Sequence, residues 1–443
     1  MMKKITAITL TMLFTASLVA CANPGSDVVS TSAETTIGIE SNTEASQANT
    51  AQTESQASGA SDKKSNSSDS IISTAAVTSN GKIDASGIFT ERDLTQSYDK
   101  SDAQTIALSD GKAVSITKAG VYILSGTAND VTVTVDAGDN DKVQLVLDGA
   151  SITNSSAPAI YVKNADKVFV TTTESENYLS VTGTFEADGD TNTDAVIFSK
   201  DDLVLNGLGT LTVTSTDNGI SCKDDLKITG GTINVTSSAD SLEANDSIAI
   251  SGGNITISSG KDGLHAENDE DDSKGYIYIC GGTLGINASS DGIQGTTVVQ
   301  IDGGKLDITA SEGIEGTYIQ INGGEISISA SDDGINASSK SSSYPVTFEM
   351  NGGNVTVDMG AGDTDGVDSN GDIYINGGTI SVNGQSTFDY DGTAQHNGGT
   401  IIVNGSETDE IPNQFMGGGP GGMGGGMDGG MGGSMGAPNG NMG

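Results

Sequence analysis

An acidic residue, a glycine, an aliphatic residue and another polar residue recur as a unit in the second half of the chain. The units begin at residues 261 (KDGLH), 290 (SDGIQ), 311 (SEGIE), 332 (DDGIN) and 364 (TDGVD). If they stack at the spacing of neighbouring strands, about 4.8 Å, their carboxylates form a column. Two carboxylates at that distance repel by about 1 kcal/mol in water, and by roughly 3–4 kcal/mol at an effective dielectric constant of about 20. A bound cation would make such a column stable.

Calcium is the cation that these residue types favour, because it takes about six to eight oxygen ligands from carboxylates, carbonyls and water. Such oxygens stand at the acidic position of each unit, at the position three residues later, and in the acidic insertion ENDEDDSK at 267–274. The predicted ligands are Asp240, Glu243, Asp262, Asp291, Glu312, Glu315, Asp333, Asp365 and Asp368 in the column, and Asp269, Asp271 and Asp272 in the insertion. The alternative is that the Asp-Gly pairs only form hydrated turns.

Residues that could support catalysis have no specific arrangement in the sequence. Elimination on uronates needs a strong base, but the single arginine, Arg92, precedes the regular repeats, and lysines such as Lys261 have no distinguishing neighbours. Hydrolysis needs two carboxylates at a set distance, and acidic doublets are expected by chance in a chain with 59 acids. The two histidines, His265 and His396, are expected in solvent-facing loops. We therefore predict a protein that is not an enzyme, with no catalytic residue.

Pairs of glycines mark a regular repeat that must position these residues. The pairs begin at residues 230, 252, 281, 303, 323, 352, 377 and 398, so the period is near 22 residues with occasional insertions. Such a period is typical of a solenoid. Within each unit, β-branched residues alternate with polar ones at the spacing of two that strands have. Three short strands per repeat predict an all-β fold, a parallel β-helix with three faces, about 22 residues per coil and a core of stacked aliphatic side chains.

The position before each glycine pair should also stack. In the last five repeats it holds Asp302, Asn322, Asn351, Asn376 and Asn397. Stacked asparagine side chains can satisfy the backbone groups of turns and one another. We therefore predict a ladder of side-chain hydrogen bonds at this corner, with a structural role.

The N-terminus has the features of a bacterial lipoprotein signal. Two lysines precede a mostly apolar stretch, and LVAC at 18–21 matches the pattern for cleavage before Cys21 and attachment of lipid to its sulfur. The Ser/Thr/Asn-rich segment that follows and the Gly/Met-rich segment at the other end cannot bury a core. The predicted parts are a signal peptide at 1–20, a disordered tether at 21–84, the β-helix at 85–412 and a disordered tail at 413–443. The protein is expected outside the cytoplasm, anchored to a membrane through Cys21.

The net charge of −40, from 59 acidic and 19 basic residues, limits the partners. A nucleic-acid-binding protein needs a basic face, so no nucleic-acid partner is expected. A polyanionic glycan would also be repelled unless cations such as calcium bridge it to the protein. We expect a monomer.

The repeated D-G-[ILV]-x-[AGS] and G-G-x-[ILV]-x-[ILV] units resemble a family of carbohydrate-binding domain-containing lipoproteins from anaerobic bacteria, over about residues 85–405. The resemblance implies a right-handed parallel β-helix, similar in fold to pectate lyases, that binds cellulose and polygalacturonate and holds calcium. Calcium binding carries over only to the acidic positions of the units. This chain departs from the pattern with Asn218, with Glu312, and with Ser241 where glycine is expected.

The leading hypothesis is a non-catalytic lipoprotein of the cell surface that binds a polysaccharide with calcium, either polygalacturonate or cellulose. Neutral glucans need flat aromatic platforms, and Tyr278 and Tyr374, which occupy the same outward strand position, are the candidates for carbohydrate binding. One alternative is a polysaccharide lyase or glycoside hydrolase built on a β-helix. A second is a structural or adhesive surface spacer whose acidic column consists of plain turns.

Overall fold

The computed structural model describes residues 81–361 and 364–414. The predicted signal peptide, Cys21, most of the predicted tether and nearly all of the predicted tail lie outside these residues. The described chain is mostly strand, with a single 3-10 turn, η1(Ala85–Gly87), and one short helix, α1(Glu91–Leu94). No helix in this part of the chain is long and apolar enough to cross a membrane.

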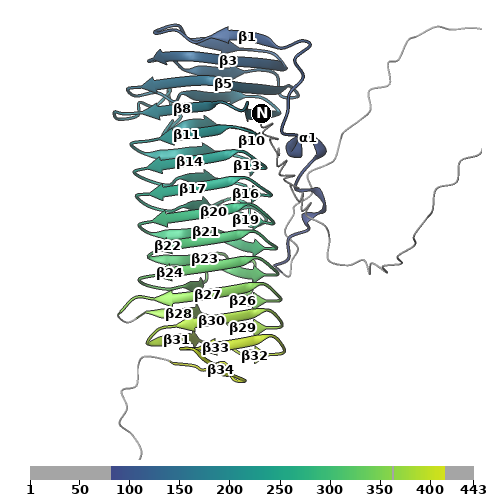
Figure 1. The fold of residues 1–443 in the computed structure, drawn as a ribbon, viewed down its shortest axis with the longest axis vertical. Helices are drawn as coiled ribbons and strands as arrows, with labels where there is room; N and C mark the ends of the chain where they lie inside the picture. Colours follow the sequence, from purple (N-terminus) through teal and green to yellow (C-terminus); the bar gives the residue numbers. More distant parts are fainter. Residues whose placement is uncertain (1–80, 362–363, 415–443) are drawn as a thin grey trace, which may run out of the picture.

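Three series of parallel strand pairings build the body of the protein, because most strands pair with the corresponding strand one coil further along (Figure 1). Ile220 pairs with Leu242, and Leu226 with Ile248, each pair 22 residues apart. The last pairing, between β33 and β34, is antiparallel and ends the stack. The prediction of an all-β parallel solenoid is confirmed, whereas the handedness and the cross-section of its coil stay predictions.

We call the three series the covered sheet, the open sheet and the acidic sheet. The covered sheet contains β1(Gln104–Ala107), β3(Gly120–Asn129), β5(Lys142–Asn154), β7(Lys167–Thr172), β10(Asp202–Gly207), β13(Asp225–Ile228), β16(Ser247–Ile250), β19(Tyr276–Ile279), the second halves of β21(Asp291–Ile301) and β23(Glu312–Ile321), β26(Thr347–Met350), β29(Asp372–Ile375) and β32(Ala394–His396). The open sheet contains the second halves of β3 and β5, then β8(Glu176–Val181), β11(Thr210–Thr214), β14(Thr232–Ser237), β17(Asn254–Ser259), β20(Thr283–Ala288), β22(Lys305–Ala310), β24(Glu325–Ala330), β27(Asn354–Met359), β30(Thr379–Asn383), β33(Thr400–Val403) and β34(Ser406–Thr408). The acidic sheet contains β2(Val114–Ile116), β4(Val133–Asp136), β6(Ile160–Asn164), β9(Ala195–Ser199), β12(Asn218–Cys222), β15(Leu242–Ala244), β18(Leu264–Ala266), the first halves of β21 and β23, β25(Ile335–Ala337), β28(Asp365–Ser369) and β31(Ser386–Tyr390).

Aliphatic side chains that point inward stack in rows and form one continuous core. In the acidic sheet a row runs through Ile220, Leu242, Leu264, Ile293 and Ile314, all fully buried. Burial of one such side chain contributes roughly 1.5–3 kcal/mol. Because successive residues of a strand face opposite sides, the residues between these positions face outward, and there the chemistry of the site is placed.

Residues 81–98, which we call the strap, run along the outside of the covered sheet (Figure 1). Ile83 and Ile88 of the strap form a buried cluster with Tyr276, Tyr278 and Tyr318 of the sheet. The strap thus adds a second, smaller apolar core outside the solenoid.

Polar contacts fix the strap at both ends. The backbone N–H of Ile83 donates a 2.9 Å hydrogen bond to Gln300 Oε1, 217 residues further along the chain. At the other end, the fully buried carboxylate of Asp93 lies 3.5 Å from Lys167 Nζ. The predicted boundary at residues 84–85 is therefore wrong by a few residues, because Ile83 packs against the solenoid instead of belonging to a tether.

Candidate functional site

The acidic residues of the repeated units stack along one edge of the acidic sheet and form what we call the acidic column. Its first row contains Asn218, Asp240, Asp262, Asp291, Glu312, Asp333 and Asp365, and its second row, three residues later in each coil, contains Ser221, Glu243, His265, Gln294, Glu315, Asn336 and Asp368. The predicted stacking of these positions is thus present in the structure.

Hydrogen bonds to the backbone explain why the first row needs a side-chain oxygen. The N–H of Asp262 donates to Asp240 Oδ1 at 2.9 Å, and the N–H of Asp291 donates to Asp262 Oδ1 at 3.0 Å. At the start of the row, Asn218 Oδ1 accepts the N–H of Asp240 at 2.9 Å. One oxygen of each such carboxylate is therefore used by the fold, and the other is available for different contacts.

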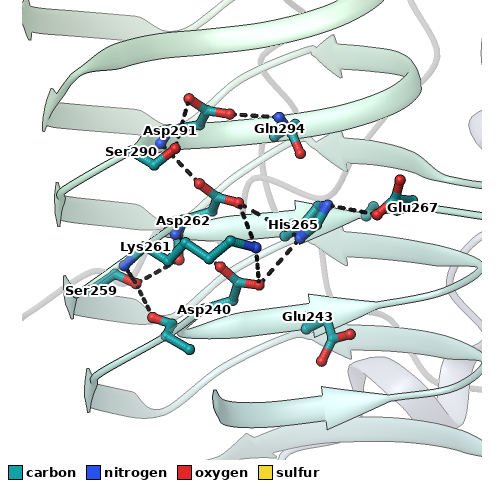
Figure 2. A network of polar contacts seen from close by, with 12 residues as sticks. Asp240, Glu243, Ser259, Lys261, Asp262, His265, Glu267, Ser290, Asp291 and Gln294 are labelled. Atoms are coloured by element: carbon teal, nitrogen blue, oxygen red, sulfur yellow. Dashed lines mark hydrogen bonds and ion pairs between the residues drawn. The ribbon is translucent and has the colours of Figure 1, made fainter. Parts of the chain in front are cut away.

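Two basic groups neutralise the column at the coils of Asp240 and Asp262 (Figure 2). Lys261 Nζ lies 3.3 Å from Asp240 Oδ2 and 3.8 Å from Asp262 Oδ2. His265 Nδ1 lies 3.3 Å and 3.7 Å from the same two oxygens. Burial opposes ionisation of Asp240, but hydrogen bonds from His265 and from the Asp262 N–H outweigh it and lower the pKa of Asp240. The protein thus supplies its own cations to this pair of acids.

The next coils hold a group of three acids with far less neutralisation. Oxygens of Asp291, Glu312 and Glu315 lie within 4.8 Å of one another. Burial, together with the neighbouring carboxylates, raises the pKa of Asp291 to about 7. Gln294 Nε2 donates to Asp291 Oδ2 and to Glu315 Oε2, both at 2.6 Å. Lys340 Nζ, 2.7 Å from Glu315 Oε2, is the one lysine that contacts these three acids in the described chain.

Uncompensated charge continues in the coils nearer the C-terminus. Burial, with Asp368 and Glu312 nearby, raises the pKa of Asp333 to about 7, and burial with Asp365 and other acids raises the pKa of Asp368 to about 6. Asn336 donates from Nδ2 to Glu312 Oε2 at 3.0 Å, while its buried Oδ1 has no hydrogen-bond partner among the described residues. An amide oxygen without a partner beside crowded carboxylates suits an oxygen-seeking cation.

The acids of the insertion do not converge in the same way. Asp271 accepts hydrogen bonds from the backbone and hydroxyl of Ser273, two residues away. Asp272 accepts from Ser341 Oγ at 3.5 Å, and Asp269 lies on the wall of a separate cavity. Because successive residues of a loop point in different directions, each acid finds its own local contacts, and the predicted second calcium site in the insertion is not assembled.

Sequence reasoning missed two features of the site. His265, expected in a solvent-facing loop, is a buried residue of β18 in contact with the column, so that expectation is wrong. Asp224, Asp225 and Asp246 form another group whose oxygens lie within 4.8 Å of one another. The signals were present in the chain: His265 occupies the last position of the unit KDGLH, and Asp224 and Asp246 are one 22-residue period apart.

The two tyrosines predicted to bind carbohydrate have different surroundings. Tyr278 is only 2% exposed beneath the strap, and its hydroxyl donates to Asp302 Oδ2 at 2.8 Å. Its prediction as a sugar platform is wrong in this structure, because Ile83 and Ile88 already occupy the face of the sheet around it. Tyr374 is half-buried on β29, donates to Asp372 Oδ2 at 2.9 Å, and stays a candidate.

Comparison with known proteins defines the class to which this solenoid belongs. A family model described as "Carbohydrate-binding domain-containing protein" matches residues 110–366, more than half of the chain. The chain therefore belongs to this carbohydrate-binding domain family, as the repeated units predict.

Two relatives give the extent of the similarity. A curated carbohydrate-binding domain-containing protein of Acetivibrio thermocellus is 38% identical over 177 residues, which cover 37% of this chain and 61% of the relative. This chain thus spans about three fifths of the length of that relative. A solved structure described as the polysaccharide lyase-like protein from C. thermocellum, a gadolinium derivative, is 36% identical, covers 50% of this chain and 92% of its own, and has a TM-score of 0.44.

Proposed function

We propose that the protein binds an acidic, pectin-like polysaccharide outside the cell, without cleaving it, through calcium held in the acidic column. The observation that carries the proposal is the group of buried Asp291, half-buried Glu312 and buried Glu315, whose oxygens lie within 4.8 Å of one another. The donor set fits calcium, which takes oxygen ligands. Carboxylates forced together in this way gain most from a divalent ion, because it removes their mutual repulsion.

Calcium also explains how so acidic a protein would hold an acidic glycan. Uronate carboxylates would complete the coordination of an ion whose protein ligands leave positions open. Cellulose, the other predicted glycan, has less support, because Tyr278 is buried under the strap and only Tyr374 remains half-exposed at that strand position. Membership of a carbohydrate-binding family supports the general class of partner.

The charge state of Lys261 argues for binding over elimination. Burial favours its neutral form, but Asp240 and Asp262 outweigh burial and raise the pKa of Lys261. A general base must release its proton near the working pH, and this lysine holds it. Arg92, the single arginine, lies in the strap, and its guanidinium carbon is 4.5 Å from the centre of the Phe169 ring of β7. We therefore keep the lyase as the less supported alternative.

Location completes the proposal. Lipid on Cys21 would anchor the chain to a membrane, and the following Ser/Thr/Asn-rich segment would hold a right-handed, monomeric β-helix away from that surface. The glycan would then be part of a cell wall or of plant material outside the cell.

Calorimetry on the chelator-treated protein tests this function. We expect calcium to bind first, and polygalacturonate to bind only when calcium is present, with no release of unsaturated uronate products. Absence of any heat or stability change with calcium would leave a hydrated turn ladder and favour the spacer alternative. Release of unsaturated products would instead identify a lyase.

A further inference from the structure

A polar cavity of about 390 Å³ lies beside the N-terminal part of the acidic column, where no calcium is proposed. Its wall is formed by β15, β18 and the insertion at 267–274. The lining includes Glu243, Asn245, His265, Glu267, Asn268 and Asp269. Residues with imidazole and carboxylate groups therefore line the same space.

His265 lines this cavity, and its two nitrogens have different surroundings (Figure 2). Nδ1 lies 3.3 Å from Asp240 Oδ2, on the side of the acidic column. Nε2 is buried and makes no hydrogen bond within the described chain, although Glu267 Oε2 is 3.4 Å away. The carboxylate of Asp240 holds a proton on Nδ1. Against the effect of burial, the surrounding acids raise the pKa of His265 in the metal-free protein, so a metal ion at Nε2 would displace the proton that this nitrogen carries there.

This arrangement is the one that metal-binding histidines use. Such a histidine generally donates its second ring nitrogen to a carboxylate, which orients the ring and strengthens the other nitrogen as a ligand. The distance between ligand atoms also fits, because two atoms about 2.0–2.1 Å from a tetrahedral zinc ion lie roughly 3.3–3.4 Å apart. The separation of His265 Nε2 and Glu267 Oε2 is 3.4 Å.

We propose that this cavity binds a transition-metal ion of the zinc type, with His265 Nε2 and the carboxylate of Glu267 as ligands. Both oxygens of Glu243 already contact Asn218 and Lys223, so water would complete the coordination. The ion is distinct from calcium, because imidazole nitrogen suits zinc, nickel and copper whereas calcium takes oxygen. It would join the insertion, through Glu267, to the body of the solenoid.

Zinc titration of the untagged, chelator-treated chain in excess calcium tests the site. We expect one zinc ion to bind to the wild-type protein, and the affinity to fall at least about tenfold in the variants His265→Gln and Glu267→Gln. Glutamine is a matched substitution at residue 265, because Gln294 occupies the equivalent position in the next coil. Calcium binding and the unfolding temperature of the variants report whether the fold is kept.

His396 provides the control, since the chain has only two histidines. Its ring faces the backbone carbonyls of Asp409 and Gly399, on β32 far from the cavity in sequence. His396→Gln should bind zinc as the wild type does. The copper-loaded His396→Gln variant should also show nitrogen coupling in its electron paramagnetic resonance spectrum, and His265 is then the only imidazole that can cause it.

Two results would overturn the proposal. One is a wild-type protein that binds no zinc in the presence of calcium. The other is equal zinc affinity in wild type and His265→Gln, together with no nitrogen coupling in copper-loaded His396→Gln. The resonance measurement on copper-loaded His396→Gln leaves residue 265 unchanged. It therefore tests the proposal even if His265→Gln folds poorly.

Discussion

Two corners of the same coil carry stacked polar side chains, and the two stacks are built differently. In the asparagine ladder, Asn322 Nδ2 donates to Asp302 Oδ1 at 2.7 Å, and Asn351, Asn376 and Asn397 each donate to the preceding asparagine at 2.8 Å. In the acidic column, carboxylates accept backbone N–H groups and contact Lys261, His265, Gln294 and Lys340.

The difference follows from what each side chain can donate. An amide has both a donor and an acceptor, so a column of asparagines satisfies itself without outside help. An ionised carboxylate only accepts, so a column of acids must take its donors and its positive charge from elsewhere. The amide ladder is therefore complete as a structure, and the acidic column gains stability from ligands.

The largest expected effect comes from removing the charge of the least neutralised acids. Asp291→Asn combined with Glu312→Gln should lower calcium affinity by on the order of 100-fold, because calcium affinity depends on the number of charged ligands. Calcium-dependent binding of polygalacturonate should be lost with it, as measured by calorimetry. Asp271→Asn, in the insertion, is the matched control and should bind calcium normally; a similar loss there would show that the insertion does hold the ion.

A pH dependence of stability should appear in the calcium-free protein. The pKa values of Asp291 and Asp333 are raised to about 7, from 3.8. Between these values the folded state binds more protons than the unfolded state, so stability falls as pH rises from about 4 to about 7. Allowing for solvent screening, we expect a loss of more than about 1 kcal/mol between pH 5 and pH 8 in urea unfolding. Saturating calcium should reduce or abolish this loss. A free energy of unfolding that rises over the same pH range would contradict the raised pKa values of these two carboxyl groups.

An amide placed in the acidic column should stabilise the protein when calcium is absent. In the wild type, Asp333 Oδ1 accepts the N–H of Asp365 at 3.2 Å. In Asp333→Asn, the amide oxygen can still accept this N–H, as Asn218 Oδ1 does for Asp240. The hydrogen bond is kept and the repulsion is removed, so the unfolding free energy should rise by about 1 kcal/mol at pH 8. Urea unfolding of the metal-free variant measures it, and a loss of stability would mean that the charge of Asp333 is needed by the fold itself.

The reverse exchange, an acid in the asparagine ladder, should have the smallest effect. Asn351→Asp removes the donor to Asn322 and places a carboxylate between two amides of an exposed corner. We expect a loss of roughly 0.5–1.5 kcal/mol in the unfolding free energy. Asn397→Asp, at the end of the ladder, should cost about as much, since each of these two asparagines donates one hydrogen bond to the preceding one. A much larger loss at residue 351 than at residue 397 would show that the ladder depends on more than these single hydrogen bonds.

Features that repeat with the coil could be predicted from the sequence. The repeated units place Asn351 over Asn322 and Asp291 over Asp262, although insertions lengthen the period to 29 residues in both of these steps. Both stacks are present as expected. The ladder and the column needed no knowledge beyond strand spacing and side-chain chemistry. Their residue types also indicate which of the two would attract a cation.

Features that cross the repeat could not be predicted in this way. The strap has no sequence repeat, and Ile83 contacts Gln300 at a separation of 217 residues. The residues around Tyr278 in the sequence therefore do not indicate that the strap buries it. His265 is hidden for another reason: its place in the repeat is regular, but its role depends on Asp240 from the preceding coil and on Glu267 from an insertion. Such contacts depend on the folded geometry.

The strap also determines how the protein carries mechanical load. Gly81 lies against the ring of Tyr318, and from there the chain passes Ile83, α1 and Thr95 before it enters β1 at the end of the stack. A pull on the chain that precedes residue 81 therefore acts on the flank of the solenoid, and the strap must detach before tension reaches the first coil. The strap's apolar cluster and the Asp93–Lys167 pair would thus break first under force. The coils with the acidic column would keep their fold while the strap detaches.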